Sequence, residues 1–296
     1  MFIENSRALI VEGGAMRGIF ASGVLDAFMS SEFKPYDFAI GVSAGASNLL
    51  GYLSNQPKRS YNVITELATT KRFFNPKRFL KGGDLVDVNW LWQESNQRYP
   101  IDKHSLFDGI PFLATVTNVS DGHADYYRIN ESNMKEALIA TAALPIAVKS
   151  PPCFSGGCYT DGGVADSIPV KEAYRRGARD ITVVLSHPLS YHMNPAKHPW
   201  LMKKLLSRYP GVAEAMLHRA ENYNASLEFI RNPPADTVIK VVAPPENFSV
   251  KRLTMKPDIL EDGYQMGLEA GYSHMTNLMG HHGLTEENCH FCLATG

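Results

Sequence analysis

A serine between two glycines is the first candidate for chemistry. Residues 41–45 read Gly-Val-Ser-Ala-Gly, so Ser43 is flanked by Gly41 and Gly45. An apolar run of strand length precedes the pattern and a stretch of helical spacing follows it, which is the context of a nucleophile elbow. The glycines would let strand and helix pass closely, and the helix N-terminus would face developing negative charge. The same residues would also suit a plain tight turn with a capping serine.

A glycine-rich loop is the second candidate. Residues 13–18 read Gly-Gly-Ala-Met-Arg-Gly after another short apolar run. Backbone N–H groups exposed by a glycine pair could donate to an oxyanion or to a phosphate. A dinucleotide fingerprint would require glycine where Ala15 stands. Arg17 would either form a salt bridge or add positive potential at an oxyanion hole. Neighbouring parallel strands would bring this loop and Ser43 to one edge of a sheet.

The third candidate is Asp161, which Gly162 and Gly163 follow. A nucleophilic serine needs a partner that takes its proton. A carboxylate can serve without histidine if it bonds the serine directly in a dry pocket, where its basicity rises. Taken alone, Asp-Gly-Gly is most often a turn, and residues 159–163 are expected to form a tight loop.

The surrounding elements alternate between strand and helix. Strands are expected at residues 8–11, 37–41, 112–119, 126–129, 181–185 and 237–242, and helices at 44–53, 133–143, 169–176, 198–231 and 257–278. This order predicts an α/β fold of three layers, with a mostly parallel central sheet and helices on both faces. Residues 54–110 are expected to form short helices and loops over the sheet. Since no repeat or linker interrupts the chain, residues 1–296 are interpreted as one domain.

The bulk composition excludes several classes of protein. Of 296 residues, 44% are hydrophobic and 20% charged, which is a globular composition. A net charge of -1 gives no reason to expect a nucleic-acid partner. There is no run of about 18 apolar residues and no signal-peptide pattern at the N-terminus, so a cytoplasmic protein is expected.

The four cysteines leave alternatives open. They are Cys153, Cys158, Cys289 and Cys292. All four could bind one zinc ion, and the last pair could form a disulfide, but the C-x4-C spacing of the first pair favours reduced, unpaired thiols. The histidines form no pattern of a catalytic metal site, and no metal or cofactor is expected.

Taken together and in this order, the three motifs resemble those of the patatin-like phospholipase family. The loop at residues 9–18 and the segments 140–146 and 159–170 look like its bacterial branch. The resemblance covers at least residues 7–186 and is weaker over 187–296. It implies a patatin-like domain with its core at 7–186 and a C-terminal extension of helices and a strand at 187–296.

The resemblance also implies roles for the motif residues. Ser43 would be the nucleophile and Asp161 the base of a Ser–Asp dyad that cleaves carboxylic esters of lipids through an acyl-enzyme. The oxyanion loop would comprise Gly13, Gly14, Ala15, Arg17 and Gly18, with the N–H groups around Gly14 and Ala15 as donors. The family's loop is Gly-Gly-Gly-x-Arg-Gly or close to it, so Ala15 and Met16 depart from it. Ala15 is expected to donate its N–H from a negative φ.

Two other functions remain open. His187 could complete a Ser43–Asp161–His187 triad of an esterase, or the chain could be a non-catalytic lipid-binding protein. The expected partner is a lipid or fatty-acyl ester. Residues 71–81 and 200–208 could make peripheral membrane contact or pack as surface helices. Four methionines could line an acyl pocket or pack in the core, namely Met216, Met266, Met275 and Met279.

Overall fold

One sheet of eight strands forms the centre of the molecule in the computed structural model, which describes residues 4–280. The strands are β1 (Ser6–Val11), β2 (Phe38–Val42), β3 (Phe112–Asn118), β4 (Ala124–Arg128), β5 (Cys153–Phe154), β6 (Gly157–Asp161), β7 (Ala178–Val184) and β8 (Val238–Val242). Their order is β5-β6-β3-β2-β1-β7-β8, with β4 also paired to β3. The pairs from β3 through β8 are parallel, and β4, β5 and β6 make antiparallel pairs. The prediction of a mostly parallel sheet is therefore confirmed.

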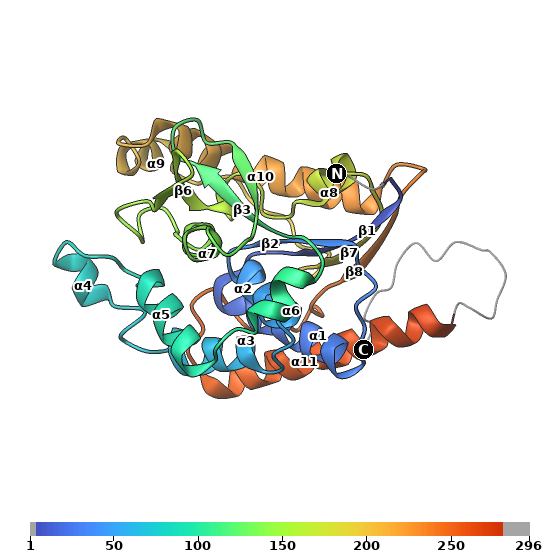
Figure 1. The fold of residues 1–296 in the computed structure, drawn as a ribbon. Coiled ribbons are helices and arrows are strands. Elements are labelled where there is room, and N and C mark those ends of the chain that lie inside the picture. Colours follow the sequence, from blue (N-terminus) through green and yellow to red (C-terminus); the bar gives the residue numbers. More distant parts are fainter. Residues whose placement is uncertain (1–3, 281–296) are drawn as a thin grey trace.

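Helices cover both faces of this sheet, as predicted (Figure 1). They are α1 (Gly18–Ser30), α2 (Ala44–Leu53), α3 (Arg59–Asn62), α4 (Pro76–Leu80), α5 (Val88–Arg98), α6 (Lys103–Asp108), α7 (Met134–Thr141), α8 (Val170–Arg175), α9 (Pro199–Leu205), α10 (Pro210–Arg231) and α11 (Pro257–Gly280). There are also two short 3₁₀ helices, η1 (Ala15–Arg17) and η3 (Gly162–Val164), and a π-helix, η2 (Val63–Ala68). Helices α1, α2 and α11 lie on one face, and α8 and α10 on the other. Among residues 4–280, no helix has both the length and the apolar character that crossing a bilayer requires.

Strand β1 shows why the sheet needs cover on both sides. Leu9 and Val11 belong to the hydrophobic cluster beneath α1 and α2. Ala8 and Ile10 point the other way, into the cluster that α8 and α10 complete. All four side chains are fully buried. An uninterrupted apolar run is typical of a parallel strand whose two faces are both covered.

Two elements differ from the sequence expectations. Residues 198–231 form two helices rather than one, since α9 ends at Leu205 and Pro210 opens α10. A proline has no N–H to continue the preceding helix and suits the first turn of the next. The expectation of a tight loop over residues 159–163 is also partly wrong. Strand β6 extends through Asp161, which pairs with Val116 of β3, and the chain turns only at η3.

The first cysteine pair corrects another expectation. Cys153 and Cys158 form a disulfide, whereas unpaired thiols were predicted. The β5–β6 register places the two residues directly opposite one another across a hairpin, so their side chains meet. Cys289 and Cys292 lie outside the described residues.

The C-terminal helix α11 packs against α1 through glycines. A β-carbon added to Gly23 of α1 would lie 2.2 Å from the carbonyl oxygen of Tyr264 in α11. One added to Gly267 would lie 2.1 Å from the carbonyl oxygen of Phe20. The backbones of the two helices therefore approach more closely than any side chain would allow.

This contact predicts that Gly23→Ala destabilises the protein despite the better helix propensity of alanine. Overpacking of this kind costs about 1–3 kcal/mol of unfolding free energy, measurable by denaturant titration. Gly51→Ala in α2 is the matched control, because its new methyl would face only the Ser60 hydroxyl, at 3.0 Å. A Gly23→Ala protein as stable as Gly51→Ala would contradict the close contact.

Candidate active site

Ser43 lies on a sharp turn between β2 and α2. Its φ of 53° and ψ of -122° are values that a side-chain-bearing residue rarely adopts, and its hydroxyl does not cap the helix. Steric contacts require glycine at both flanking positions. A β-carbon on Gly41 would lie 2.6 Å from Ala46 Cα, and one on Gly45 only 2.3 Å from the Val11 carbonyl oxygen. The turn therefore has elbow geometry, not that of a capped turn.

The sheet register brings Asp161 to this serine. Val42 of β2 is paired with Thr115 of β3, and the next residue of β3, Val116, is paired with Asp161 of β6. The Ser43 hydroxyl donates to Asp161 Oδ2 at 2.7 Å, although the two residues are 118 positions apart. The other carboxylate oxygen, Oδ1, accepts the N–H of Gly163 at 2.8 Å.

Burial sets the basicity of the Asp161 carboxylate. Only 3% of the residue is exposed. Loss of solvent raises its pKa above the ordinary value, and this outweighs the hydrogen bonds from Ser43 and Gly163 and the attraction of Arg252 and Arg219, which lower it. A carboxylate of raised pKa that holds a serine hydroxyl is arranged to accept its proton.

Gly162 and Gly163 shape the turn after Asp161. A β-carbon on Gly162 would lie 2.1 Å from the Thr115 carbonyl oxygen, so only glycine lets the chain leave β6 this close to β3. At Gly163 the added carbon would be 3.0 Å from Asp161 Oδ1, against the oxygen that the Gly163 N–H binds. The first glycine permits the turn and the second helps to fix the carboxylate.

Thr141 is a site residue that sequence reasoning missed. Its hydroxyl accepts the backbone N–H of Ser43 at 2.9 Å and donates to the Thr115 carbonyl oxygen at 2.5 Å. The strained turn at Ser43 is thus tied to β3. The Ser43 N–H is occupied and is not available to an oxyanion. The segment containing Thr141 carried part of the family resemblance, but nothing in the sequence showed this contact.

The glycine loop lies against the elbow. A β-carbon on Gly13 would lie 3.1 Å from Ser43 Cβ, and one on Gly14 would lie 2.7 Å from Ser186 Cβ. Met16 N–H and Arg17 N–H bond to backbone oxygens of Arg252 and Gly14, whereas in the described part of the chain the N–H groups of Gly14 and Ala15 have no acceptor. These two groups are therefore free to donate to a bound oxyanion.

The conformation of Ala15 differs from expectation. Its φ is 51°, not negative, because the chain turns at this position from Gly14 (φ -165°, ψ 12°) into η1. An alanine in this left-handed region costs about 1–2 kcal/mol that glycine would not. Ala15 nevertheless lines the same cavity as Ser43. Gly18 starts α1, and its carbonyl oxygen accepts Asn48 Nδ2 of α2 at 2.7 Å, which joins the two helices behind the loop.

A buried carboxylate holds the loop from behind. Glu12, also missed from the sequence, accepts the Ser186 N–H at 2.6 Å and the Tyr223 hydroxyl at 3.0 Å, and burial raises its pKa. Arg17 is attracted to Glu12, but burial lowers its pKa, and its Nε is buried without a hydrogen-bond partner. Arg17 forms no ion pair with the described residues, so the structure does not support the salt-bridge alternative.

Two further arginines act on the site from the C-terminal part of the chain. Arg219 of α10 donates from Nε to the Gly163 carbonyl oxygen at 2.5 Å and so holds the turn beside Asp161. Arg252 lines the cavity at Ser43. Burial, and to a smaller extent like-charge repulsion from Arg252, lowers the pKa of both Arg17 and Arg219. No sequence signal connected these residues with the motifs.

His187 does not join the pair. Its ring stacks on Tyr191 with 3.7 Å between centroids and an interplanar angle of 2°. Burial and the positive charges of Arg17, Arg252 and Arg219 lower its pKa to about 3. It makes no hydrogen bond to Ser43 or Asp161 in the described structure. The geometry of a triad is therefore absent, and the serine meets the carboxylate directly.

An apolar cavity of about 130 Å³ opens at Ser43. Its wall is mostly hydrophobic and includes Met16, Ile64, Phe73, Val88, Leu144 and Met255. The methionines proposed for this role lie elsewhere. Met216 lies on α10 and packs against the cluster that includes Leu206. Met266 and Met275 belong to the core under α1, and the side chain of Met279 is outside the described part. The cavity is suited to a hydrocarbon chain attached to a group at Ser43.

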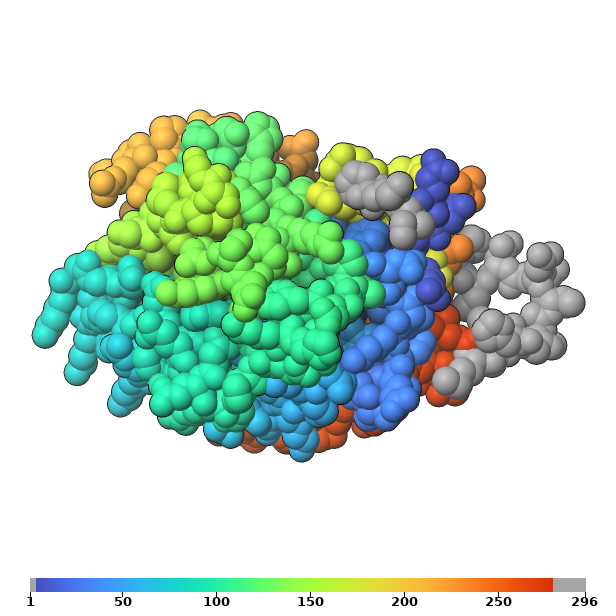
Figure 2. All heavy atoms as spheres, in the orientation of Figure 1, coloured from blue at the N-terminus to red at the C-terminus, as the bar shows by residue number. Residues whose placement is uncertain are grey.

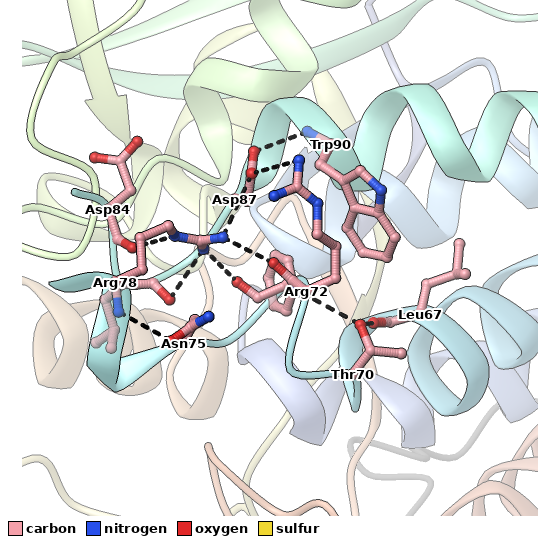
Figure 3. A network of polar contacts seen from close by, with 10 residues as sticks. Leu67, Thr70, Arg72, Asn75, Arg78, Asp84, Asp87 and Trp90 are labelled. Atoms are coloured by element: carbon pink, nitrogen blue, oxygen red, sulfur yellow. Dashed lines mark hydrogen bonds and ion pairs between the residues drawn. The ribbon is translucent and has the colours of Figure 1, made fainter.

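Part of the cavity wall is held by Arg78 (Figure 3). Its guanidinium donates to the carbonyl oxygens of Asp84, Arg72 and Phe73 at 2.7–2.9 Å and lies 3.5 Å from Asp87. Asp87 in turn caps α5. This network fixes the segment that contributes Phe73, Phe74, Val86 and Val88 to the wall. The Arg78 side chain is 22% exposed, and its guanidinium is occupied by hydrogen bonds within the fold. Among residues 4–280, no group of three or more His, Cys, Asp or Glu could hold a metal ion.

Comparison with known proteins agrees with this geometry. A family model described as patatin-like phospholipase matches residues 9–174, and a model for a domain of unknown function matches 209–280. The uncharacterized protein YjjU of Escherichia coli (strain K12) is 33% identical over 274 residues, which are 89% of this chain and 75% of that protein. The 1-acylglycerol-3-phosphate O-acyltransferase PNPLA3 of Homo sapiens is 31% identical over 139 residues, 45% of this chain and 28% of that protein.

A solved structure supports the fold. The crystal structure of VipD from Legionella pneumophila superposes with a TM-score of 0.50 and 12% identity, over 93% of this chain and 68% of that one. The family match covers more than half of the chain and includes the elbow, the glycine loop and Asp161. The chain therefore belongs to the patatin-like phospholipase family.

Proposed function

We propose that the protein hydrolyses carboxylic esters of lipids, with Ser43 as nucleophile and Asp161 as general base. The observation that carries the proposal is the 2.7 Å hydrogen bond between these side chains, whose serine lines an apolar cavity. The name of PNPLA3, a relative that acts on 1-acylglycerol-3-phosphate, supports an acyl chain on a glycerophosphate backbone as the class of substrate.

The proposed reaction proceeds in two steps. Asp161 accepts the Ser43 proton while Oγ attacks the ester carbonyl, and the leaving alcohol then takes that proton, which gives an acyl-enzyme. Water next attacks the acyl-enzyme and transfers a proton to Asp161. Collapse of the intermediate returns a proton to Ser43 and releases the fatty acid. The unpaired N–H groups of Gly14 and Ala15, with the positive potential of Arg17, would stabilise the oxyanion in both steps.

The alternatives have less support. A triad needs a histidine between the serine and the carboxylate, and His187 instead stacks on Tyr191. A non-catalytic lipid-binding protein would need the cavity but would have no use for a strained serine or for a buried carboxylate bonded to it.

The dyad predicts that Asp161→Asn lowers kcat by about 100-fold or more, since a general base contributes at least that much. Hydrolysis of a soluble nitrophenyl ester measures the loss, and a fluorophosphonate probe should label wild type but not Ser43→Ala. Asp166→Asn is the matched control, because this nearby carboxyl is partly buried and also has a raised pKa, mainly through loss of solvent, but it bonds Tyr126 instead of Ser43. Equal activity of the two Asp→Asn variants would refute the assignment of Asp161.

The pH dependence separates the dyad from a triad. Only ionised Asp161 can take the proton, so kcat/KM should rise with pH through the pKa of Asp161, which lies above 3.8. His187, with a pKa of about 3, is neutral throughout the working range. We expect His187→Gln to keep both the activity and the acid limb of wild type. Loss of that limb in His187→Gln would favour the triad.

The cavity predicts a preference for long acyl chains. Each buried methylene contributes about 0.8 kcal/mol, so kcat/KM should rise by roughly fourfold per methylene until the cavity is filled. Val88→Phe should shorten the preferred chain while activity on the acetate ester is preserved, which also shows that the variant is folded. Unchanged chain-length selectivity in Val88→Phe would place the acyl chain elsewhere.

A further inference from the structure

A second hollow lies next to the site and joins two segments that are far apart in sequence. It measures about 280 Å³, and its lining includes Phe79 of α4, Ile146 and Lys149 of the loop after α7, and Leu205 and Arg208 at the end of α9. We call it the α4–α9 groove. In Figures 1 and 2, α4 (cyan) and α9 (orange) project at the same end of the molecule. The sequence offered residues 71–81 and 200–208 as two separate candidates for membrane contact. In the structure they contribute to one surface.

This surface exposes large apolar side chains. Leu80 is 85% exposed, Trp200 66% and Leu205 55%, and Leu201 and Ile146 are also exposed. Ile146 adopts a φ of 70°, a strained value for a β-branched residue. Isolated exposed apolar residues are normal, but here two line the groove, Ile146 and Leu205, and three more lie on the helices that border it. Five on adjoining elements indicate a surface that is covered in use.

Basic residues surround these apolar side chains. Lys77 and Lys81 lie on or beside α4, Lys149 beside the groove, and Lys204 and Arg208 on or after α9. Within the part of the chain that the structure describes, none of these five forms an ion pair. Lys149 instead lies 5.2 Å from the centre of the Phe79 ring. Exposed leucines and a tryptophan within a set of uncompensated cations match the interface of a bilayer that contains anionic lipid.

The groove lies close to the residues of the proposed chemistry. Its lining includes Thr160, whose neighbour in the chain is Asp161, and Pro145, which follows the cavity residue Leu144. The Ala143 carbonyl oxygen accepts both the Thr160 hydroxyl and the Asp161 N–H. The loop at 142–149 is fastened to the α4 side through Leu85 N–H to the Ala147 oxygen and Lys149 N–H to Asp84. One wall therefore separates the groove from the acyl cavity.

We infer that the surface around the α4–α9 groove docks on an anionic lipid bilayer, with the leucines and Trp200 in the interface and the lysines on the headgroups. The inference rests on the proposed function, because docking here would hold the part of the protein beside the site against the lipid esters that the proposed reaction consumes.

Vesicle flotation tests this docking independently of catalysis if all proteins carry Ser43→Ala. One vesicle type is dioleoylphosphatidylcholine, and in the other about a third of the lipid is dioleoylphosphatidylglycerol. We expect the parent protein to prefer the anionic vesicles and to lose that preference in high salt. Lys77→Glu with Lys204→Glu should weaken this binding at least tenfold, since each basic side chain contributes about fivefold. Leu80→Ser with Leu205→Ser should weaken binding to both vesicle types.

The matched controls lie away from the groove. Lys171→Glu changes an exposed lysine of α8, which Figure 1 places at the other end of the molecule, and Val238→Ser removes an apolar side chain that is 53% exposed at the start of β8. Both should bind as the parent does. With Ser43 restored, the groove variants should hydrolyse a soluble acetate ester as wild type does, which shows that they are folded.

The outcomes separate the two proposals. No binding of the parent to anionic vesicles, or equal losses in groove and control variants, would overturn the docking surface. Binding that depends on the groove in a protein whose Ser43-intact form hydrolyses no ester would support docking and refute the proposed function.

Discussion

The hydrogen bond between Ser43 and Asp161 depends on one structural constraint, the register of β3. This strand pairs with β2 through Thr115 and with β6 through Val116, so it fixes how far the end of β2 lies from the end of β6. Thr115 also accepts the Thr141 hydroxyl that binds the Ser43 N–H, and its carbonyl oxygen leaves room only for a glycine at 162. A shift of one residue in β3 would turn its side chains to the opposite faces and separate the serine from its carboxylate.

Burial and the nearby positive charges have opposite effects on the pKa of Asp161. Burial makes the Asp161 carboxylate more basic, and the nearby guanidinium groups of Arg219 and Arg252 limit that rise. Burial lowers the pKa of His187, and the same positive charges, together with Arg17, lower it further, so the ring stays neutral. An environment that disfavours a protonated imidazole is poorly suited to histidine as the general base, but it favours negative charge on an oxyanion and on a carboxylate. Electrostatics and geometry thus favour the same two-residue mechanism.

The segment between α2 and β3 gives the site its apolar surroundings. Its short helices do not extend the sheet, but they supply much of the cavity wall and carry α4 to the edge of the groove. Arg78 stabilises the segment through backbone carbonyl groups, as its internal hydrogen bonds show. The surface cations of α4 that remain exposed are lysines, whose flexible ammonium groups suit nonspecific contact with headgroups better than a fixed guanidinium would.

The sequence alone determined the elements and the motifs. The apolar run of β1 and the elbow glycines follow from local sterics and from burial, which a linear pattern records. The order of the three motifs was enough to indicate the family, and hence the pairing of Ser43 with Asp161. The sequence pattern also predicted a sheet with both faces covered, because strands and helices alternate along the chain.

Only the tertiary structure decided which distant residues share the site. Glu12, Thr141, Arg219 and Arg252 carry no local signature, since their roles depend on what the folded chain places beside them. The positive φ of Ala15 and the pairing of Cys153 with Cys158 likewise follow from how the chain turns and from strand register. That α4 and α9 contribute to one surface is likewise seen only in the folded structure. Side-chain contacts across more than a hundred residues are set by the packing of elements, which the spacing of residues along the chain does not specify.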